Sequence, residues 1–162
     1  VYTLATRPGP HRKSEIVAAY GATYVSTRQE KMADLAKRVG RPDLIFEATG
    51  NAEAGFRAME VLAINGALIW TSVTGGTREV TIDAARINLE WVLGNKLLVS
   101  SVNGNRRHFE LGIQALSHGE HTYPGVTGRL LTDPLNGLDH YQEMMRLLED
   151  KEALKVFVNV AL

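Results

Sequence analysis

The stretch DLIFEATGNAEAGFRAMEVLAINGALIW (residues 43–70) places a strand, a helix and a second strand in close succession. Its first run, residues 43–47, is short and almost continuously apolar, which is typical of a strand covered on both faces. Asn51 is a favourable helix cap, and apolar residues follow it at helical spacing. Residues 66–70 form a second apolar run. A helix between two buried strands predicts a parallel pair joined by a right-handed crossover.

The same alternation extends from this stretch toward both ends of the chain. The connections are only a few residues long, so the helices must cover the faces of a parallel sheet. We therefore predict an α/β fold with a doubly wound, Rossmann-type parallel sheet. Strands are expected at residues 1–6, 23–25, 43–47, 66–70, 79–82 and 96–102, and helices at residues 13–20, 31–39, 51–62, 84–93 and 107–117, the last with Phe109, Ile113 and Leu116 facing inward.

The pattern changes after Ser117. Residues 118–125 are expected to form a loop, 126–132 a strand, 139–149 an amphipathic helix and 155–160 a closing strand. This tail does not look like another strand–helix unit. We therefore expect a partial nucleotide-binding domain at residues 1–125 and a return segment at 126–162 that packs on a further domain.

Composition excludes several classes of function. The 162 residues suit one domain, and 18 basic residues balance 18 acidic ones. Without a net positive charge we expect no nucleic-acid partner. No apolar run approaches the roughly 20 residues of a membrane span, so no membrane partner is expected. There is no cysteine, which excludes disulfides and is compatible with a reducing compartment; we expect a cytoplasmic location.

The glycine fingerprint GxGxxG of dinucleotide-binding folds does not occur in the sequence. That fingerprint lies between the first strand and its helix. The opening strand would then be the second strand of the sheet, and the first strand and its glycine loop would precede residue 1. We expect a portion of a longer protein, in which the strands at residues 1–6 and 43–47 flank the missing first strand.

Small polar residues follow successive strands. They occur in the loops at residues 47–51, 71–76 and 100–104, rich in glycine, serine and threonine. Ligands of open parallel sheets bind beyond the carboxyl ends of the strands, and such loops let a flat ligand approach the backbone. Glycine–serine–threonine loops are also common neutral connectors, so each loop alone is a weak signal.

Arg7 follows the opening strand, where no acidic residue occurs. At the end of the second strand an acidic residue selects the free 2′-hydroxyl of NAD, whereas an arginine accommodates the 2′-phosphate of NADP. A guanidinium binds phosphate in a bidentate manner. The sequence therefore favours NADP over NAD, with a solvated surface arginine as the alternative.

Four segments carry a resemblance to a known family: GATYV (21–25), DLIFEATG (43–50), NGALIWTSV (65–73) and NKLLVSSVNGNRRHFELGIQAL (95–116). They resemble the medium-chain, usually zinc-dependent, alcohol and polyol dehydrogenases, and most of all the glucose 1-dehydrogenase branch. The resemblance covers essentially the whole chain. It implies the C-terminal nucleotide-binding part of an enzyme that oxidises a sugar or polyol with NADP, or NAD, as hydride acceptor.

The resemblance also implies roles for individual residues. Thr6 and Arg7 would sense the 2′-phosphate, although the branch can carry arginine at both positions and Thr6 departs from that. The remaining implied positions are Thr49 and Gly50 near the adenosine half, Ser72, Val73, Val102 and Asn103 around the nicotinamide, and Lys155 near the pyrophosphate.

No residue of this chain matches the family's zinc ligands or proton-relay residues, which belong to a catalytic domain N-terminal to this region. We therefore expect neither catalytic nor metal-binding residues here, and no turnover by this chain alone. The resemblance further implies a homo-oligomer that associates through the nucleotide-binding domain, with residues 96–102 as a candidate edge.

One other reading stays open. A regulatory module could share the fold and bind a nucleotide without chemistry; the tail argues against it, because a self-contained sensor has no need of a segment that enters another domain. A metal site at His118, Glu120 and His121 would need a fixed geometry that a loop does not provide.

Overall fold

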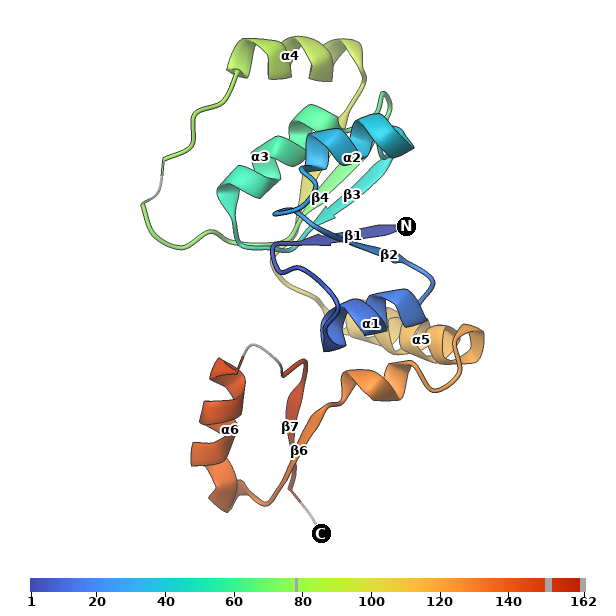
Figure 1. Cartoon of the computed structure of the whole chain (residues 1–162), viewed down its shortest axis with the longest axis vertical. Coiled ribbons are helices and arrows are strands. Elements are labelled where there is room, and N and C mark those ends of the chain that lie inside the picture. The colour runs from blue at the N-terminus through green and yellow to red at the C-terminus, as the bar shows by residue number, and fades with distance from the viewer. Residues whose placement is uncertain (78, 151–152, 161–162) are drawn as a thin grey trace. The chain divides into compact units, whose positions relative to one another are not determined.

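The computed structural model describes residues 1–77, 79–150 and 153–160 of the chain as an α/β structure with parallel strands (Figure 1). In chain order the elements are β1 (Tyr2–Ala5), α1 (Arg12–Ala19), β2 (Thr23–Ser26), α2 (Met32–Val39), β3 (Leu44–Glu47), α3 (Ala52–Val61), β4 (Ala67–Trp70), α4 (Ala84–Leu93), β5 (Leu97–Ser100), α5 (Arg106–Thr122), the 3-10 turn η1 (Thr127–Leu130), β6 (Asp133–Asn136), the 3-10 turn η2 (Leu138–His140), α6 (Tyr141–Glu149) and β7 (Val156–Asn159). The predicted α/β class is confirmed.

The chain divides into two compact units, one formed by residues 27–104 and the other by residues 1–26 with 105–162. In the first, β3, β4 and β5 form a parallel sheet in that order. In the second, β1 pairs with β2 and β6 with β7, each in parallel. The strands expected to flank the missing first strand, β1 and β3, thus belong to different sheets.

The core of the unit 27–104 lies between α3 and the sheet. Ala58, Leu62 and Leu68 are almost completely buried, and partly buried apolar side chains pack around them. Asn51 caps α3 as predicted: its side chain accepts a hydrogen bond from the backbone N–H of Glu53 at 3.0 Å. These contacts fix α3 directly after the end of β3.

Gly55 lies where α3 packs against Trp70 of β4. A Cβ atom built on Gly55 would lie 2.8 Å from Cε2 and from Cη2 of the Trp70 indole. The same indole meets the ring of Phe56 edge-on, with 5.4 Å between the ring centroids. A glycine at position 55 therefore lets Trp70, the last residue of β4, lie against the helix.

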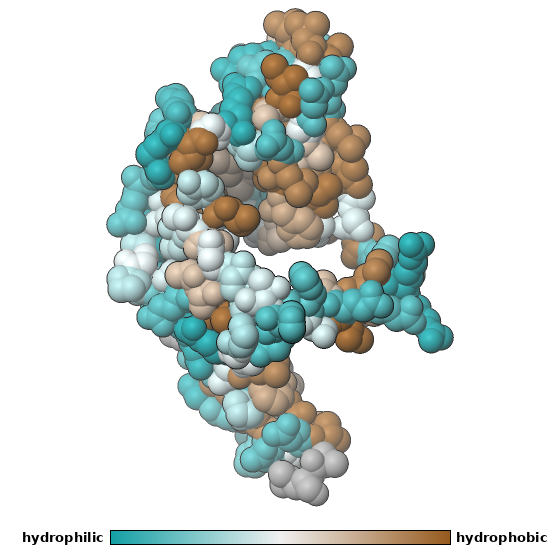
Figure 2. All heavy atoms as spheres, turned by 90° about the vertical axis from the view of Figure 1, so that its right-hand side faces the viewer, coloured by the Kyte–Doolittle hydropathy of each residue, from teal (hydrophilic) through white to brown (hydrophobic). Residues whose placement is uncertain are grey.

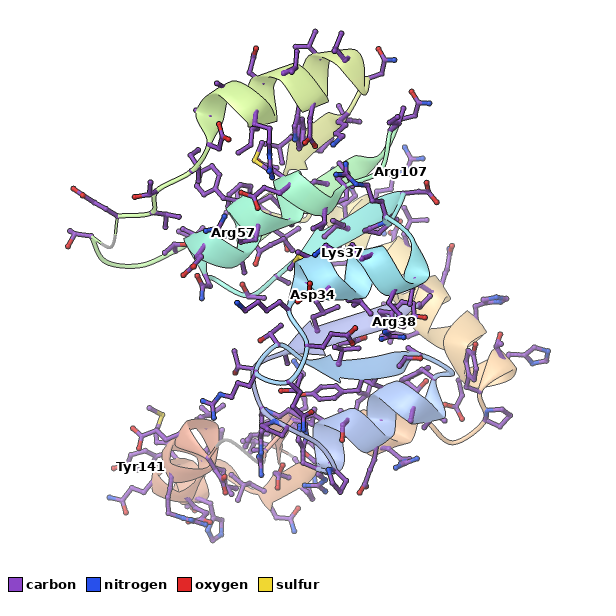
Figure 3. The ribbon with its side chains drawn as sticks, turned by 45° about the horizontal axis from the view of Figure 1, so that its top comes forward. Asp34, Lys37, Arg38, Arg57, Arg107 and Tyr141 are labelled. Carbon is purple, nitrogen blue, oxygen red and sulfur yellow. The ribbon has the colours of Figure 1, made fainter. Side chains whose placement is uncertain are left out.

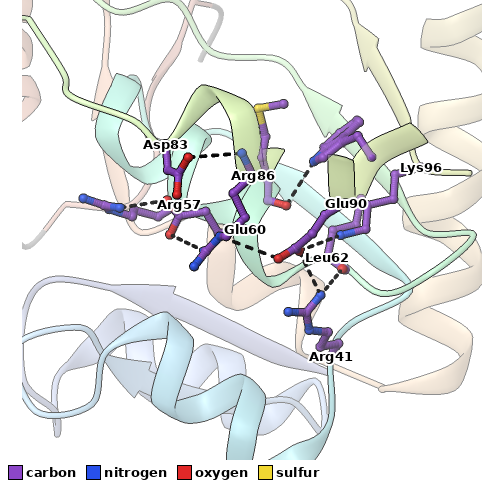
Figure 4. A network of polar contacts seen from close by, with 10 residues as sticks. Arg41, Arg57, Glu60, Leu62, Asp83, Arg86, Glu90 and Lys96 are labelled. Atoms are coloured by element: carbon purple, nitrogen blue, oxygen red, sulfur yellow. Dashed lines mark hydrogen bonds and ion pairs between the residues drawn. The ribbon is translucent and has the colours of Figure 1, made fainter. Parts of the chain in front are cut away.

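Charged side chains join α3, α4 and the segments before β3 and β5 (Figure 4). Glu60 pairs with Arg57 at 2.8 Å, and Glu90 pairs with Arg41 at 3.4 Å and with Lys96 at 3.5 Å. The Lys96 side chain is only 1% exposed. By contrast, the pair between Asp34 and Lys37 on α2 is exposed (Figure 3), and such pairs contribute little to stability.

In the other unit, α1 begins with a capping box. The His11 ring accepts a hydrogen bond from the backbone N–H of Ser14, whose hydroxyl lies 2.9 Å from the backbone N–H of His11. The helix ends near Gly21, which has a φ of +71° and lies beside Tyr123 after α5. The rings of Tyr20 and Tyr123 meet edge-on.

The tail is a strand–helix–strand unit, and the expectation that it would not be one is wrong. β6 and β7 pair in parallel, with α6 between them along the chain. The expected strand at 126–132 is instead the turn η1 followed by irregular backbone up to β6. Residues 151–152 and 161–162 of the expected return segment lie outside the described residues.

Three further expectations need correction. Residues 79–82 have no regular structure, and α5 continues through residues 118–122, which we expected to be a loop. Phe109, Ile113 and Leu116 are exposed rather than inward-facing, because nothing in the described chain covers that side of α5.

Apolar side chains are also exposed in the unit 27–104. Figure 2 shows hydrophobic residues gathered in the upper part of the view, where this unit lies. They include members of α4 and of the edge strands β3 and β5. No helix within the described residues is both long and apolar enough to cross a membrane.

Candidate functional site

The candidate site lies at the carboxyl ends of β3, β4 and β5. In the sheet register, Glu47 pairs with Trp70, and Trp70 with Ser100, so the three strands end level with one another. The backbone N–H of Thr71 donates to the carbonyl of Glu47 at 3.0 Å, and that of Ser101 to the carbonyl of Trp70 at 3.2 Å. The register therefore brings the loops after these strands to one edge of the sheet, as the sequence predicted.

An open pocket of about 450 Å³ lies between the loops that follow β4 and β5. Its walls combine hydroxyl groups with apolar surface: Trp70, Thr71, Ser72, Val73, Leu98, Ser100, Ser101 and Val102 line it. Two of the apolar members, Val73 and Val102, are each 78% exposed. The pocket thus offers both a few polar groups and apolar surface to a ligand, the combination that small-molecule sites require.

Glu47, the last residue of β3, is a buried acid, with 4% of its surface exposed. One carboxylate oxygen accepts hydrogen bonds from the backbone N–H of Thr49, at 2.7 Å, and from the Thr49 hydroxyl. The other accepts a hydrogen bond from the hydroxyl of Ser72. The side chain thereby connects the loop after β3 to the loop after β4.

Hydrogen bonding decides the ionisation of this acid. Burial raises the pKa of Glu47, but the hydrogen bonds from Ser72 and Thr49 together outweigh burial, so its pKa lies below the ordinary value. Glu47 forms no ion pair within the described part of the chain. Its charge is stabilised by hydroxyl and amide donors instead.

Gly50 lies where the same two loops meet. It has a φ of +69°, and a Cβ atom at this position would be 3.4 Å from the carbonyl oxygen of Val73. The backbone N–H of the next residue, Asn51, donates to the Thr49 hydroxyl at 3.1 Å. A glycine is favoured here because it has no Cβ atom and adopts a positive φ more easily than other residues.

The structure brings together some of the predicted site residues. Thr49, Gly50 and Ser72 lie around Glu47, and Ser72, Val73 and Val102 line the pocket. Asn103 is exposed just beyond it and is not among the lining residues.

The other predicted residues belong to the unit formed by residues 1–26 and 105–162. Thr6 and Arg7 are exposed directly after β1; their carbonyl groups accept hydrogen bonds from Ser26 and Tyr24. Lys155 is exposed just before β7, and its backbone N–H donates to the Thr132 hydroxyl at 3.2 Å.

Glu47 is the residue that sequence reasoning missed. The sequence places it at the end of the strand at residues 43–47 and at the start of the loop at residues 47–51, without a role for its carboxylate. Its position in the sequence could have indicated this role. A glutamate two residues before Thr49, and level with the start of the loop after the next strand, can accept hydrogen bonds from both loops. That signal needs the strand register, which the sequence does not specify.

No group of three or more potential metal ligands occurs among the described residues. His118 and His121 are exposed on α5, and the Glu120 carboxylate accepts hydrogen bonds from the backbone N–H groups of Gly125, at 2.6 Å, and Thr127. The Glu120 side chain therefore closes the end of the helix.

The site has the chemistry to hold part of a dinucleotide. The hydroxyls of Ser100 and Ser101 and the exposed apolar surface of Val73 and Val102 suit a flat, partly polar ring. No glycine-rich phosphate loop occurs in the chain.

Comparisons with known proteins point in the same direction. The family model described as "Glucose dehydrogenase C-terminus" matches residues 1–160. A glucose 1-dehydrogenase of Methanocella arvoryzae is 31% identical over 160 residues, which cover 99% of this chain and 44% of that protein. A glucose 1-dehydrogenase 1 of Caldivirga maquilingensis is 34% identical over 143 residues, covering 87% of this chain and 38% of that protein.

Solved structures agree with the sequence matches. Haloferax mediterranei glucose dehydrogenase in complex with NADP, Zn and gluconolactone has a TM-score of 0.85 at 27% identity, over 99% of this chain and 43% of that chain. An alcohol dehydrogenase of Thermotoga maritima, 21% identical with a TM-score of 0.79 over 99% of this chain and 43% of that one, shares the fold. The chain spans less than half the length of the relatives it matches.

Proposed function

This chain belongs to the family of glucose dehydrogenase C-terminal domains, and on that premise we propose that it is the NADP-binding part of an enzyme that oxidises a sugar. The observation that carries the proposal is the open pocket at the carboxyl ends of β4 and β5, lined by hydroxyl groups and exposed valines. This is the edge at which parallel α/β sheets bind nucleotides.

The residues of this chain would bind and orient the cofactor. Bound NADP supplies a nicotinamide ring that accepts a hydride. Ser72, Val73 and Val102, with Asn103 beside them, would border that ring. Thr49 and Gly50 would lie near the adenosine half, Thr6 and Arg7 near the 2′-phosphate, and Lys155 near the pyrophosphate.

We place the chemistry on the substrate in the part of the protein that this chain does not contain. The Haloferax mediterranei relative was solved with zinc and gluconolactone. We propose a sugar or polyol substrate and a zinc ion held by residues outside this chain. The residues described here would contribute the cofactor half only. The cytoplasmic location expected from the cysteine-free sequence is part of the same proposal.

Calorimetric titration of the purified chain with NADPH, and in parallel with NADH, tests the proposal. We expect saturable binding of NADPH and weaker binding of NADH, because Arg7 suits a 2′-phosphate. Glucose without cofactor should release no heat of binding, since no sugar site is assigned to these residues. If neither dinucleotide binds, the assignment of a cofactor site is wrong. If NADH binds more tightly than NADPH, the cofactor site stands but the predicted preference for NADP is wrong.

We also propose that the parent protein is a homo-oligomer that associates through the edge strand β5. This strand exposes three apolar side chains, Leu97 (55%), Leu98 (39%) and Val99 (41%). Edge strands of monomeric proteins seldom expose so much apolar surface. Sedimentation velocity over a range of concentrations tests this: the dimer fraction should fall when Leu98 is replaced by glutamate. A monomer at all concentrations would contradict it.

A further inference from the structure

We propose that Glu47 is a positioning residue of the cofactor pocket: its carboxylate connects the loop after β3 to the loop after β4 and so holds in place the residues that would receive the dinucleotide. The inference rests on the proposed function and assigns a role to a residue outside the set discussed for cofactor binding.

The geometry is that of a carboxylate shared between two loops. Thr49, on the first loop, donates its backbone N–H and its hydroxyl to one oxygen, and Ser72, on the second, donates its hydroxyl to the other. The main chain of Glu47 adds a further link, because its carbonyl accepts both the backbone N–H and the hydroxyl of Thr71, each at 3.0 Å. One residue thus contacts both loops through its side chain and its backbone.

The second loop borders the pocket directly, and the first loop lies against the second at Gly50. Ser72 and Val73 line the pocket. The carbonyl oxygen of Val73 lies 3.4 Å from the position that a Cβ atom on Gly50 would occupy. If Ser72 moved away from Glu47, the Val73 carbonyl and Gly50 would lose their relative placement. The connection therefore sets the shape of one wall of the pocket.

An ionised acid suits this role better than a neutral group. The three donors that converge on Glu47 all offer hydrogens, and hydrogen bonds to a charged acceptor are roughly twice as strong as neutral ones. Since Glu47 is 4% exposed, water cannot readily replace a lost donor. The direction of its pKa, below the ordinary value, agrees with an acid that stays ionised at neutral pH.

The test compares NADPH affinity in four variants of the full chain. Glu47→Gln keeps the size but removes the charge, and Ser72→Ala removes only the contact with the second loop. We expect each to weaken NADPH binding about tenfold, because a charge-assisted hydrogen bond is weakened or lost in each case. The matched controls are Ser117→Ala, which removes an exposed hydroxyl on α5 that does not line the pocket, and Glu149→Gln, which neutralises an exposed acid at the end of α6. Both controls should bind NADPH within twofold of the unmodified chain.

A double-mutant cycle separates positioning from a general loss of stability. If Glu47 acts through Ser72, the double variant should have about the same NADPH affinity as the single variant that binds more weakly. If the two residues act independently, the fold-losses in affinity of the two single variants should multiply. Multiplying effects, or a Glu47→Gln variant with unchanged affinity, would overturn the inference.

Amide hydrogen exchange provides a readout that needs no cofactor. In Glu47→Gln the Thr71 amide should exchange at least tenfold faster than in the unmodified chain. The exchange rate of the Tyr20 amide, at the end of α1, should stay unchanged. If Glu47→Gln does not fold, Ser72→Ala is measured in its place, with the same expected result. If the unmodified chain binds no NADPH, the proposed function fails, and exchange alone then decides this inference. Equal exchange in variant and unmodified chain would contradict it.

Discussion

At the scale of single residues, Glu47 makes stability depend on pH in a defined direction. Its pKa in the folded chain lies below the ordinary value of 4.5, as hydrogen bonds from Ser72 and Thr49 outweigh burial. The unfolded chain therefore binds the proton more readily, and the contribution of Glu47 to stability is fully present above pH 4.5 and is lost as the pH falls through the folded pKa.

Urea unfolding at a series of pH values checks this expectation. The midpoint for the unmodified chain should fall on acidification below about pH 4.5 more steeply than the midpoint for Glu47→Gln, since the variant has no proton to take up at this position. Other carboxylates titrate in both proteins, so only the difference between the two curves is attributed to Glu47. Parallel curves would show that Glu47 contributes nothing to the acid response.

Arg7 carries the prediction on cofactor preference. Its replacement by alanine should weaken binding of NADPH about tenfold and leave binding of NADH within twofold, because only NADPH carries the 2′-phosphate that a guanidinium binds. Arg107, exposed in the first turn of α5, offers a matched control: Arg107→Ala should change neither affinity. Equal losses for both dinucleotides in the Arg7 variant would assign Arg7 to another part of the cofactor.

The sequence predicted some single residues well and others not at all. Asn51 caps α3 as expected, because a short polar side chain at the start of a helix acts locally. The roles of His11 as a cap and of Glu47 as a link between loops depend on where the chain places distant groups. Local rules therefore sufficed only where the interaction was itself local.

At the scale of elements, the contact between α3 and β4 depends on Gly55. Replacing Gly55 by alanine would place a methyl group 2.8 Å from two atoms of the Trp70 indole, which is partly buried and packs against the helix. Because overpacking of a core typically costs 1–3 kcal/mol, we expect a loss of about 2 kcal/mol in the free energy of unfolding, measured by urea titration.

Gly112→Ala supplies the control for that variant. Gly112 also lies inside a helix, α5, but a Cβ atom there would meet nothing within 4 Å. Alanine should then stabilise the chain by up to about 1 kcal/mol through helix propensity alone. If Gly55→Ala were equally stabilising, the packing of Trp70 on α3 would not be as tight as described.

Among the elements, the tail is where pattern reasoning failed. β6 has the sequence Asp133-Pro-Leu-Asn136, and a proline together with two turn-favouring residues argues against a strand. The parallel pairing with β7 requires the intervening α6 to bring the two segments together. The alternating strands and helices of residues 31–70 were predicted more accurately, because their apolar runs are nearly continuous and Asn51 caps α3.

At the scale of the whole molecule, the chain covers less than half the length of its relatives, and we expect it to be inactive alone. Incubated with glucose, NADP and zinc, it should produce no NADPH detectable by absorbance above a blank without protein. The physical reason is that the zinc ion, which would polarise the sugar hydroxyl, is proposed to be held by residues outside this chain. Glucose-dependent NADPH formation by the purified chain would contradict this.

The overall organisation was predictable because parallel strands with short connections leave few topologies open. The division of the strands among separate sheets, β1–β2 and β3–β4–β5, was not predicted. Exposure could not be predicted: Phe109 and Ile113 have the spacing of a buried helix face but lie in solvent. Periodicity identifies a face that favours burial, whereas actual burial depends on what else is present.

The position of Trp70 has a practical consequence. It is one of two tryptophans in the chain; its indole lies against α3 and lines the pocket, whereas the other, Trp91, donates its ring N–H to the carbonyl of Met59 at 3.1 Å. The fluorescence of Trp70 should therefore report ligand binding. Occupancy of the pocket should change the emission of one indole and leave the other as an internal reference, with no dye or label required.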